Sequence, residues 1–178
     1  MLFSETPLAG AWLVELERLG DERGWFSRTF DADEFRARGL ESTVVQCNAS
    51  FNERRDTLRG LHYQAEPHDE TKLVRCVRGA IFDVGVDLRP QSPMYCAWYG
   101  VELSAENGKM LYLPRGVAHG FQTLVDGCEV LYQMGHEYVP EAARGVRWDD
   151  PAFDIRWPAP SAERTISARD RGFPDFAA

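Results

Sequence analysis

The chain has 178 residues, of which 44% are hydrophobic, 27% charged and 12% aromatic; this ordinary globular composition suits one domain over 1–178 with a sizeable core. The formal net charge of -8 excludes non-specific nucleic-acid binding, which needs a basic face to displace counterions, although a local arginine cluster can hold a small anionic ligand. No stretch approaches the roughly 18–20 apolar residues of a membrane span, and the N-terminus lacks the basic and apolar regions of a signal peptide. The four cysteines, Cys47, Cys76, Cys96 and Cys128, show no C-x-x-C spacing, which favours reduced structural thiols and a cytoplasmic location.

Short β runs separated by turn signals dominate the chain. The pattern predicts strands over 11–19, 25–30, 43–50, 57–64, 72–77, 80–88, 95–103, 110–114, 116–124 and 128–134. One short helix is predicted over 31–40, with Asp31 as its N-cap, Phe35 facing inward and Gly39 at its end. From residue 140 the chain becomes irregular and rich in Pro and Trp, and its aromatic content predicts an ordered C-terminal extension over 140–178 that packs against the body. Together these features predict an all-β jelly roll.

The period-2 pattern places polar side chains on inward faces of two strands. In CEVLYQM, Tyr132 shares one face with Cys128, Val130 and Met134, so it points inward beside apolar neighbours. In FDVGVDL, Asp83, Gly85 and Asp87 share the face opposite the one that Val84, Val86 and Leu88 form. A buried tyrosine or aspartate needs a hydrogen-bond partner, and proteins accept that cost at sites.

The histidines do not form a recognisable metal motif. A metal site in a jelly roll needs two histidines at i and i+2 with a glutamate a few residues on. No H-x-H occurs, because His62 stands in HYQ and His119 in HGF, so we expect no metal. G-x-S-x-G, G-x-G-x-x-G and Walker motifs are also absent from the sequence, and we expect neither a nucleophilic triad nor a bound cofactor.

Proton transfer is the chemistry that remains. The titratable residues in suggestive places are His62, His119, Lys72, Tyr132 and Asp170. Each has a structural alternative: a strand histidine is often a satisfied structural residue, Lys72 can be a solvated strand end, and Tyr132 can be a core tyrosine bonded to backbone. None of them alone is a specific signal.

The motifs become specific in combination. The blocks LRGLHYQ, KLVRCVRGAIFDVGVDLR, SAEN, LPRGVAHGF, EVLYQ, RWDDPAFDIRWP and ISARD follow one another in this order. Beginning at DERGWF, they closely resemble the dTDP-4-dehydrorhamnose 3,5-epimerase family, isomerases that invert carbons in nucleotide-linked 4-keto-6-deoxy sugars. The resemblance covers nearly the whole chain. It implies a metal-independent, cupin-like jelly roll (a double-stranded β-helix), a homodimer and a nucleotide-sugar substrate.

The resemblance also implies catalytic roles. His62 corresponds to the base, Asp170 to the carboxylate that orients its imidazole and balances its charge, and Tyr132 to the acid on the opposite face of the sugar. Lys72 and His119 match residues close to the sugar and its developing oxyanion.

Further residues match substrate-binding positions of the family. Arg59 corresponds to a diphosphate-binding arginine, and Arg23 to one that reaches the ligand from the partner subunit. Gln46 and Asn48 match another substrate-binding segment, and Arg169 stands where a lysine is common.

Two further positions depart from the family pattern. Arg28, which we count among the substrate-binding residues, stands where the family usually has a glutamate, and Ala143 stands where many members place a binding glutamate. Glutamate accepts hydrogen bonds from a base and arginine cannot, so we hypothesise a base other than thymine or a different sugar.

Three questions stay open at this point. The sequence does not decide whether C3, C5 or both carbons are inverted. A 3,4-ketoisomerase and a non-catalytic sugar-nucleotide-binding cupin remain alternatives. Arg59 and His62 are three residues apart, which in a regular strand sends them to opposite faces; we hypothesise a β-bulge at Gly60 that brings both into one pocket.

Overall fold

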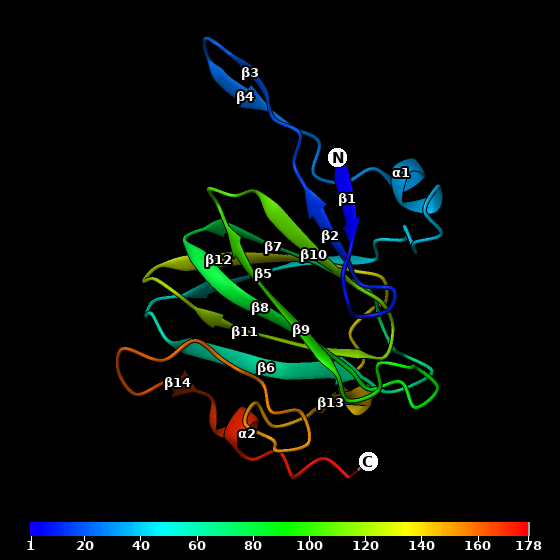
Figure 1. The fold of residues 1–178 in the computed structure, drawn as a ribbon, viewed down its shortest axis with the longest axis vertical. Helices are drawn as coiled ribbons and strands as arrows, with labels where there is room; N and C mark the ends of the chain where they lie inside the picture. The colour runs from blue at the N-terminus through cyan, green and yellow to red at the C-terminus, as the bar shows by residue number, and fades with distance from the viewer. Residues whose placement is uncertain (178) are drawn as a thin grey trace.

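The protein folds into two facing β-sheets (Figure 1). The computed structural model describes residues 1–177. Sheet 1 has the strand order β1-β2-β10-β7-β12-β5, with bounds Leu2–Glu5, Trp12–Glu15, Lys109–Leu113, Lys72–Arg78, Cys128–Met134 and Gln46–Asn52 in that order. Sheet 2 has the order β13-β6-β11-β8-β9, with bounds Ala143–Gly145, Thr57–Gln64, Val117–Thr123, Ala80–Asp87 and Trp98–Ser104. The short strand β14 (Thr165–Ile166) pairs with β6 in parallel. This architecture confirms the predicted all-β jelly roll.

The hydrophobic core lies between the two sheets. Sheet 1 contributes Val74, Cys76, Leu111 and Val130, and sheet 2 contributes Ile81, Leu103, Val117 and Phe121, all at most 2% exposed. Complete burial of such side chains stabilises the fold by about 1.5–3 kcal/mol each. On β12 the face that carries Val130 into the core continues to Tyr132 and Met134, which line a pocket. The predicted alternation therefore holds, and the space between the sheets opens into a pocket.

The C-terminal segment covers the outer face of sheet 2. Val84 and Val86, which alternate with the inward residues of β8, pack there against Val146 and Phe153. The sequence predicted irregular chain after residue 140, whereas the segment forms a 3-10 turn (Pro140–Ala142), β13, β14 and α2 (Ala168–Arg171). In Figure 1 this orange and red segment lies below β6, and its short strands β13 and β14 both pair with β6.

The predicted helix forms, but it is shorter than expected. Helix α1 spans Ala32–Arg36, and the side chain of its N-cap, Asp31, accepts hydrogen bonds from the backbone N–H groups of Asp33 and Glu34. Phe35 is fully buried, as predicted. The helix ends at Arg36, and Gly39, at φ +72°, closes the following turn.

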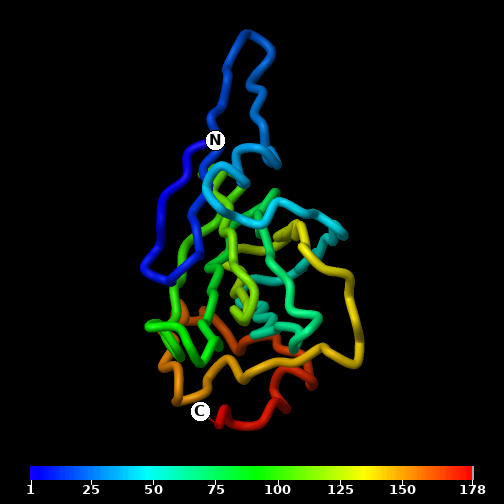
Figure 2. Tube along the Cα trace, turned by 90° about the vertical axis from the view of Figure 1, so that its right-hand side faces the viewer, coloured from blue at the N-terminus to red at the C-terminus, as the bar shows by residue number. Residues whose placement is uncertain are grey.

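The N-terminal part differs most from the prediction. Strand β1 was not predicted, and the expected strand over 11–19 divides into β2 and β3 (Leu19–Asp21). Strand β3 pairs with β4 (Gly24–Phe26) in a separate two-stranded hairpin. Figures 1 and 2 both show this hairpin extending away from the sheets, at the end opposite the C-terminal segment. Three large apolar side chains on the hairpin, Leu19, Trp25 and Phe26, are more than half exposed.

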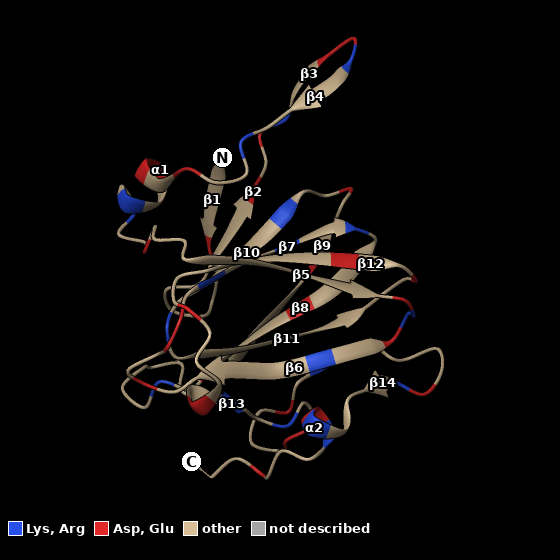
Figure 3. Ribbon diagram, turned by 180° about the vertical axis from the view of Figure 1, so that it is seen from behind, with Lys and Arg blue, Asp and Glu red and all other residues tan. Residues whose placement is uncertain are grey.

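Charged side chains are sparse within the two sheets (Figure 3). Strand β6 carries Arg59 as its one arginine or lysine, and β8 carries Asp83 and Asp87.

The four cysteines, which all fall among the described residues, are free. Within residues 1–177 no helix is long and apolar enough to cross a membrane.

Candidate active site

A pocket of about 510 Å³ opens between the two sheets and is closed on one side by the C-terminal segment. This volume falls in the range of small-molecule sites. The lining residues are Gln46, Asn48, Ser50, Arg59, His62, Tyr63, Gln64, Glu70, Lys72, His119, Phe121, Tyr132, Met134, His136, Tyr138, Ala143, Arg144 and Arg169. They include eight of the eleven residues for which the sequence predicted a catalytic or substrate-binding role.

A β-bulge in β6 turns two predicted residues into the same pocket. His62 pairs with His119 of β11, and Arg59 pairs with Phe121, so three steps on β6 face two steps on β11. The extra residue is accommodated at Gly60, whose φ is +117°. A Cβ at this position would lie 2.6 Å from the Cα of Gly120, so only glycine fits there. The bulge hypothesis is therefore confirmed.

His62 and Asp170 form a hydrogen-bonded pair. Nε2 of His62 lies 2.8 Å from Oδ1 of Asp170, and the backbone N–H of Gly60 donates to Oδ2 at 3.1 Å. Burial alone would raise the pKa of Asp170, but the hydrogen bonds from His62 and Gly60 outweigh it and hold the pKa below its ordinary value. An ionised carboxylate only accepts hydrogen bonds. Nε2 therefore carries the proton, and Nδ1 is the nitrogen that can take one from a ligand.

Tyr132 approaches the pocket from the other sheet. Its hydroxyl lies 2.9 Å from Oγ of Ser50, and its ring stands edge-on to that of His119, with centroids 6.0 Å apart. Burial raises the pKa of Tyr132 to about 12, although the hydrogen bond with Ser50 acts in the opposite direction. The phenol therefore stays protonated near neutral pH and can serve as a proton donor.

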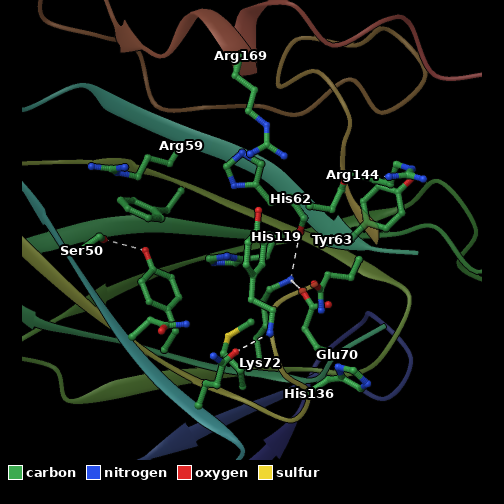
Figure 4. A pocket seen from close by; sticks show the side chains of 18 residues that line it. Ser50, Arg59, His62, Tyr63, Glu70, Lys72, His119, His136, Arg144 and Arg169 are labelled. Carbon is green, nitrogen blue, oxygen red and sulfur yellow. Dashed lines mark hydrogen bonds and ion pairs between the residues drawn. The ribbon is translucent and has the colours of Figure 1, made fainter. Parts of the chain in front are cut away.

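Lys72 is buried and held from two sides. Its Nζ donates to the backbone carbonyl of His62 at 3.2 Å and forms an ion pair with Oε1 of Glu70 at 2.6 Å. Its side chain is only 7% exposed, so the alternative of a solvated strand end is wrong. In Figure 4, Lys72 and Glu70 lie below the ring of His62, Arg169 lies above it and Arg59 lies to its left.

A second histidine–aspartate pair joins the pocket wall to the buried interior: His119 lines the pocket and Asp83 lies behind it. Nε2 of His119 is 2.7 Å from Oδ1 of Asp83, which is completely buried. Burial raises the pKa of Asp83, and its attraction and hydrogen bond to His119, together with its attraction to Lys72, offset only part of this effect. The sequence placed Asp83 on an inward face but gave no sign of this partner, because the two residues meet across neighbouring strands.

Gln46, Asn48, Arg59 and Arg169 also line the pocket, as the resemblance implied, and so does Ala143. The Nε–H of Arg59 donates to Oδ1 of Asn52 at 2.7 Å, which fixes the direction of the guanidinium.

The structure does not bring Arg23 and Arg28 to this pocket within residues 1–177. Arg23 lies at the tip of the β3–β4 hairpin and forms an ion pair with Asp21. Arg28 pairs with Asp31, the N-cap of α1, at 2.5 Å. Both arginine side chains are largely exposed, so they are available to a neighbouring molecule.

Sequence reasoning missed several lining residues. The period-2 pattern could have found Ser50, which shares a face of β5 with Gln46 and Asn48, and Met134 was placed beside Tyr132 without a role. Glu70, His136, Tyr138 and Arg144 reach the pocket from loops or from a strand that the sequence did not predict, and they gave no comparable signal. Among residues 1–177 no group of three or more His, Cys, Asp or Glu side chains is placed to hold a metal ion.

Comparisons with known proteins agree with the resemblance. A family profile described as dTDP-4-dehydrorhamnose 3,5-epimerase matches residues 5–178. A dTDP-4-dehydrorhamnose 3,5-epimerase of Methanothermobacter thermautotrophicus is 46% identical over 172 residues, which cover 96% of this chain and 92% of the relative.

Two solved structures superpose closely on the chain. The dTDP-4-dehydrorhamnose 3,5-epimerase of Elizabethkingia anophelis has a TM-score of 0.95 and 37% identity, covering 99% of this chain and 96% of its own. That of Bacillus anthracis, solved with TDP and PPi bound, has a TM-score of 0.93 and 38% identity, covering 98% of this chain and 99% of its own.

Proposed function

Since the chain belongs to the dTDP-4-dehydrorhamnose 3,5-epimerase family, we propose that it epimerises C3, C5 or both carbons of a nucleotide-linked 4-keto-6-deoxy sugar. One observation carries the mechanism. His62 belongs to sheet 2 and Tyr132 to sheet 1, and both line the pocket between the sheets. A sugar held between the sheets meets a base on one face and an acid on the other, which is what inversion of a carbon requires.

The proposed reaction proceeds through an enolate. Nδ1 of His62 removes the proton from a carbon beside the ketone, and the electron pair of that C–H bond moves onto the ketone oxygen. The ammonium of Lys72 donates to the oxygen as its negative charge develops. Tyr132 then gives its proton to the opposite face of the carbon while the ketone forms again. Asp170 stabilises the imidazolium of His62 between the two steps.

Two arginines that line the pocket near His62 suit the diphosphate of the nucleotide. Arg59 and Arg169 are the groups we assign to the diphosphate, because guanidinium forks match phosphate oxygens. Gln46 and Asn48 extend the binding surface along β5. We assign Arg23 and Arg28 to the pocket of a partner subunit in a homodimer, since the exposed apolar hairpin that carries Arg23 is suited to packing on another copy.

Solvent exchange tests the proposal. In deuterated buffer the protein should incorporate deuterium at C3, and at C5 if both carbons react, with inverted configuration in the product by NMR. A ketoisomerase would instead move the carbonyl to C3. His62→Ala should abolish exchange, whereas Tyr132→Phe should lose inversion and keep part of the exchange. Tyr95→Phe, which removes the same atom outside the pocket, should change neither.

The nucleotide is the variable of the same experiment. The dTDP, CDP and GDP forms of 4-keto-6-deoxyglucose are compared for binding and exchange. Absence of exchange with all of them contradicts the proposed function. A dTDP sugar that binds far more tightly than the other two contradicts only the expectation drawn from Arg28.

A further inference from the structure

Glu70 has an unsatisfied carboxylate oxygen in the wall of the pocket. It precedes β7 by two residues and lines the pocket, and its side chain is only 4% exposed. Oε1 forms the ion pair with Lys72, but Oε2 is buried and has no hydrogen-bond partner among the described residues. A carboxylate oxygen without a donor in a protein interior is costly, and native proteins leave few of them. Oε2 is therefore a candidate acceptor for a ligand.

Lys72 supplies a donor next to this acceptor. Its ammonium has three N–H groups. One donates to the carbonyl of His62 and one faces Glu70, which leaves a third for a ligand. Because Nζ of Lys72 lies 2.6 Å from Oε1 of Glu70 and Oε2 belongs to the same carboxylate, the free donor and the free acceptor lie close together.

A ketone with a hydroxyl on the neighbouring carbon matches this pair of groups. The carbonyl oxygen accepts from Lys72, and the hydroxyl donates to Oε2 of Glu70. We infer that Glu70 is a specificity-determining residue, which selects an α-hydroxy ketone over an analogue that lacks the hydroxyl. The inference rests on the proposed function and adds a substrate requirement to it: the carbon beside the ketone must carry a free hydroxyl.

The size of the preference follows from the hydrogen bond. A hydrogen bond to a charged group corresponds to about 10- to 150-fold in kcat/KM, and a deoxy analogue also leaves Oε2 unpaired. A 4-keto-3,6-dideoxy sugar nucleotide lacks the hydroxyl but keeps protons on both carbons beside the ketone. Deuterium exchange, measured at whichever of C3 and C5 reacts, therefore compares the two sugars.

The experiment measures this ratio in the full-length protein and in three variants. The unaltered protein should prefer the hydroxylated sugar by about 10- to 150-fold, and Glu70→Ala should reduce the preference to less than about threefold. Any displacement of Lys72 slows both sugars equally and leaves the ratio unaffected. Glu70→Gln keeps the size but loses the charge, which halves the strength of the hydrogen bond, so its preference should fall to about 3- to 12-fold. Glu66→Ala, an exposed glutamate in the same loop, should keep the full preference.

Three outcomes are distinguished. If the unaltered protein exchanges no deuterium into either sugar, the proposed function fails. If it does exchange, but Glu70→Ala retains the full preference, the role of Glu70 is refuted. Where Glu70→Ala is too slow for kinetics or does not fold, the ratio of the two dissociation constants, measured by calorimetry on Glu70→Gln, decides: an undiminished ratio refutes the role, and a reduced one supports it.

Discussion

Substitution of Gly60 tests whether the bulge in β6 builds the pocket. At φ +117° an alanine costs about 1–3 kcal/mol of backbone strain. Its Cβ would also stand 2.6 Å from the Cα of Gly120 and 2.7 Å from the carbonyl oxygen of His119. Both are backbone atoms, so β6 and β11 must separate, and overpacking of this kind costs about 1–3 kcal/mol more. We expect Gly60→Ala to lower the free energy of unfolding by about 2–6 kcal/mol.

Urea unfolding and exchange kinetics measure the two consequences. With an m value of about 2 kcal/mol/M, the unfolding midpoint should fall by about 1–3 M. Because Arg59 and His62 flank the bulge, kcat should fall by about 100-fold even where the variant is fully folded, since a misplacement of about 1 Å has that effect.

Gly39→Ala provides the matched control. Gly39 also has a positive φ, +72°, but a Cβ there would meet no atom within 4 Å, so it should cost only about 1–2 kcal/mol and leave kcat unchanged. Equal midpoint shifts in the two variants, with normal kcat in Gly60→Ala, would refute the role of the bulge.

Three other predictions address the catalytic groups. In Asp170→Asn the side-chain amide can donate to Nε2 of His62, which favours the tautomer protonated at Nδ1. We expect kcat to fall by about 10³–10⁴-fold while the circular dichroism spectrum is unchanged. A normal kcat would show that the carboxylate does not set the tautomer. The pKa of Tyr132, raised to about 12 by burial, leaves only about 1% of the phenol ionised at pH 10. Ionisation of Tyr132 should therefore cause no fall in kcat/KM for epimerisation near pH 10, and a fall there that is absent from the residual exchange of Tyr132→Phe would contradict this pKa. Because this pKa is raised on folding, the free energy of unfolding should fall as the pH rises from 10 towards 12, and less so in Tyr132→Phe. Lys72→Met leaves Glu70 buried without its cation, so the free energy of unfolding, measured in urea, should fall by about 3–5 kcal/mol. The double variant Lys72→Met/Glu70→Gln should recover part of this loss. A double variant no more stable than the single one argues against the ion pair.

The strands and the inward residues could be predicted because they depend on local pattern. Alternation along 128–134 places Tyr132 on the inner face, and an N-capping aspartate before an apolar residue locates the helix around Phe35. The three-residue spacing of Arg59 and His62, with a glycine between them, predicted a bulge once the family resemblance had assigned both residues to one pocket. In each case the physical cause lies within a few residues of the feature itself.

The rest of the site depends on contacts that no local pattern encodes. Asp83 and His119 are 36 residues apart, and they meet only because β8 pairs with β11. Glu70 reaches the pocket from a loop, where neither the two-residue period of a strand nor the 3.6-residue period of a helix predicts where a side chain points. The hairpin that carries Arg23 was misassigned because alternation continues through 11–19, while the break between β2 and β3 depends on which strand is available for pairing.

The C-terminal segment links substrate binding to catalysis. Strand β14 pairs with the start of β6, and a short helix, α2, follows it at once. On α2, Arg169 lines the pocket and the next residue, Asp170, holds the ring of His62. One docking event therefore orients the base and places a guanidinium where a diphosphate can bind. Neither Ser161 nor Asp56 lines the pocket, but the hydrogen bonds from Ser161 to Asp56 help hold this segment in place. Their loss should therefore disturb both the orientation of His62 and the position of Arg169, so kcat and KM should change together.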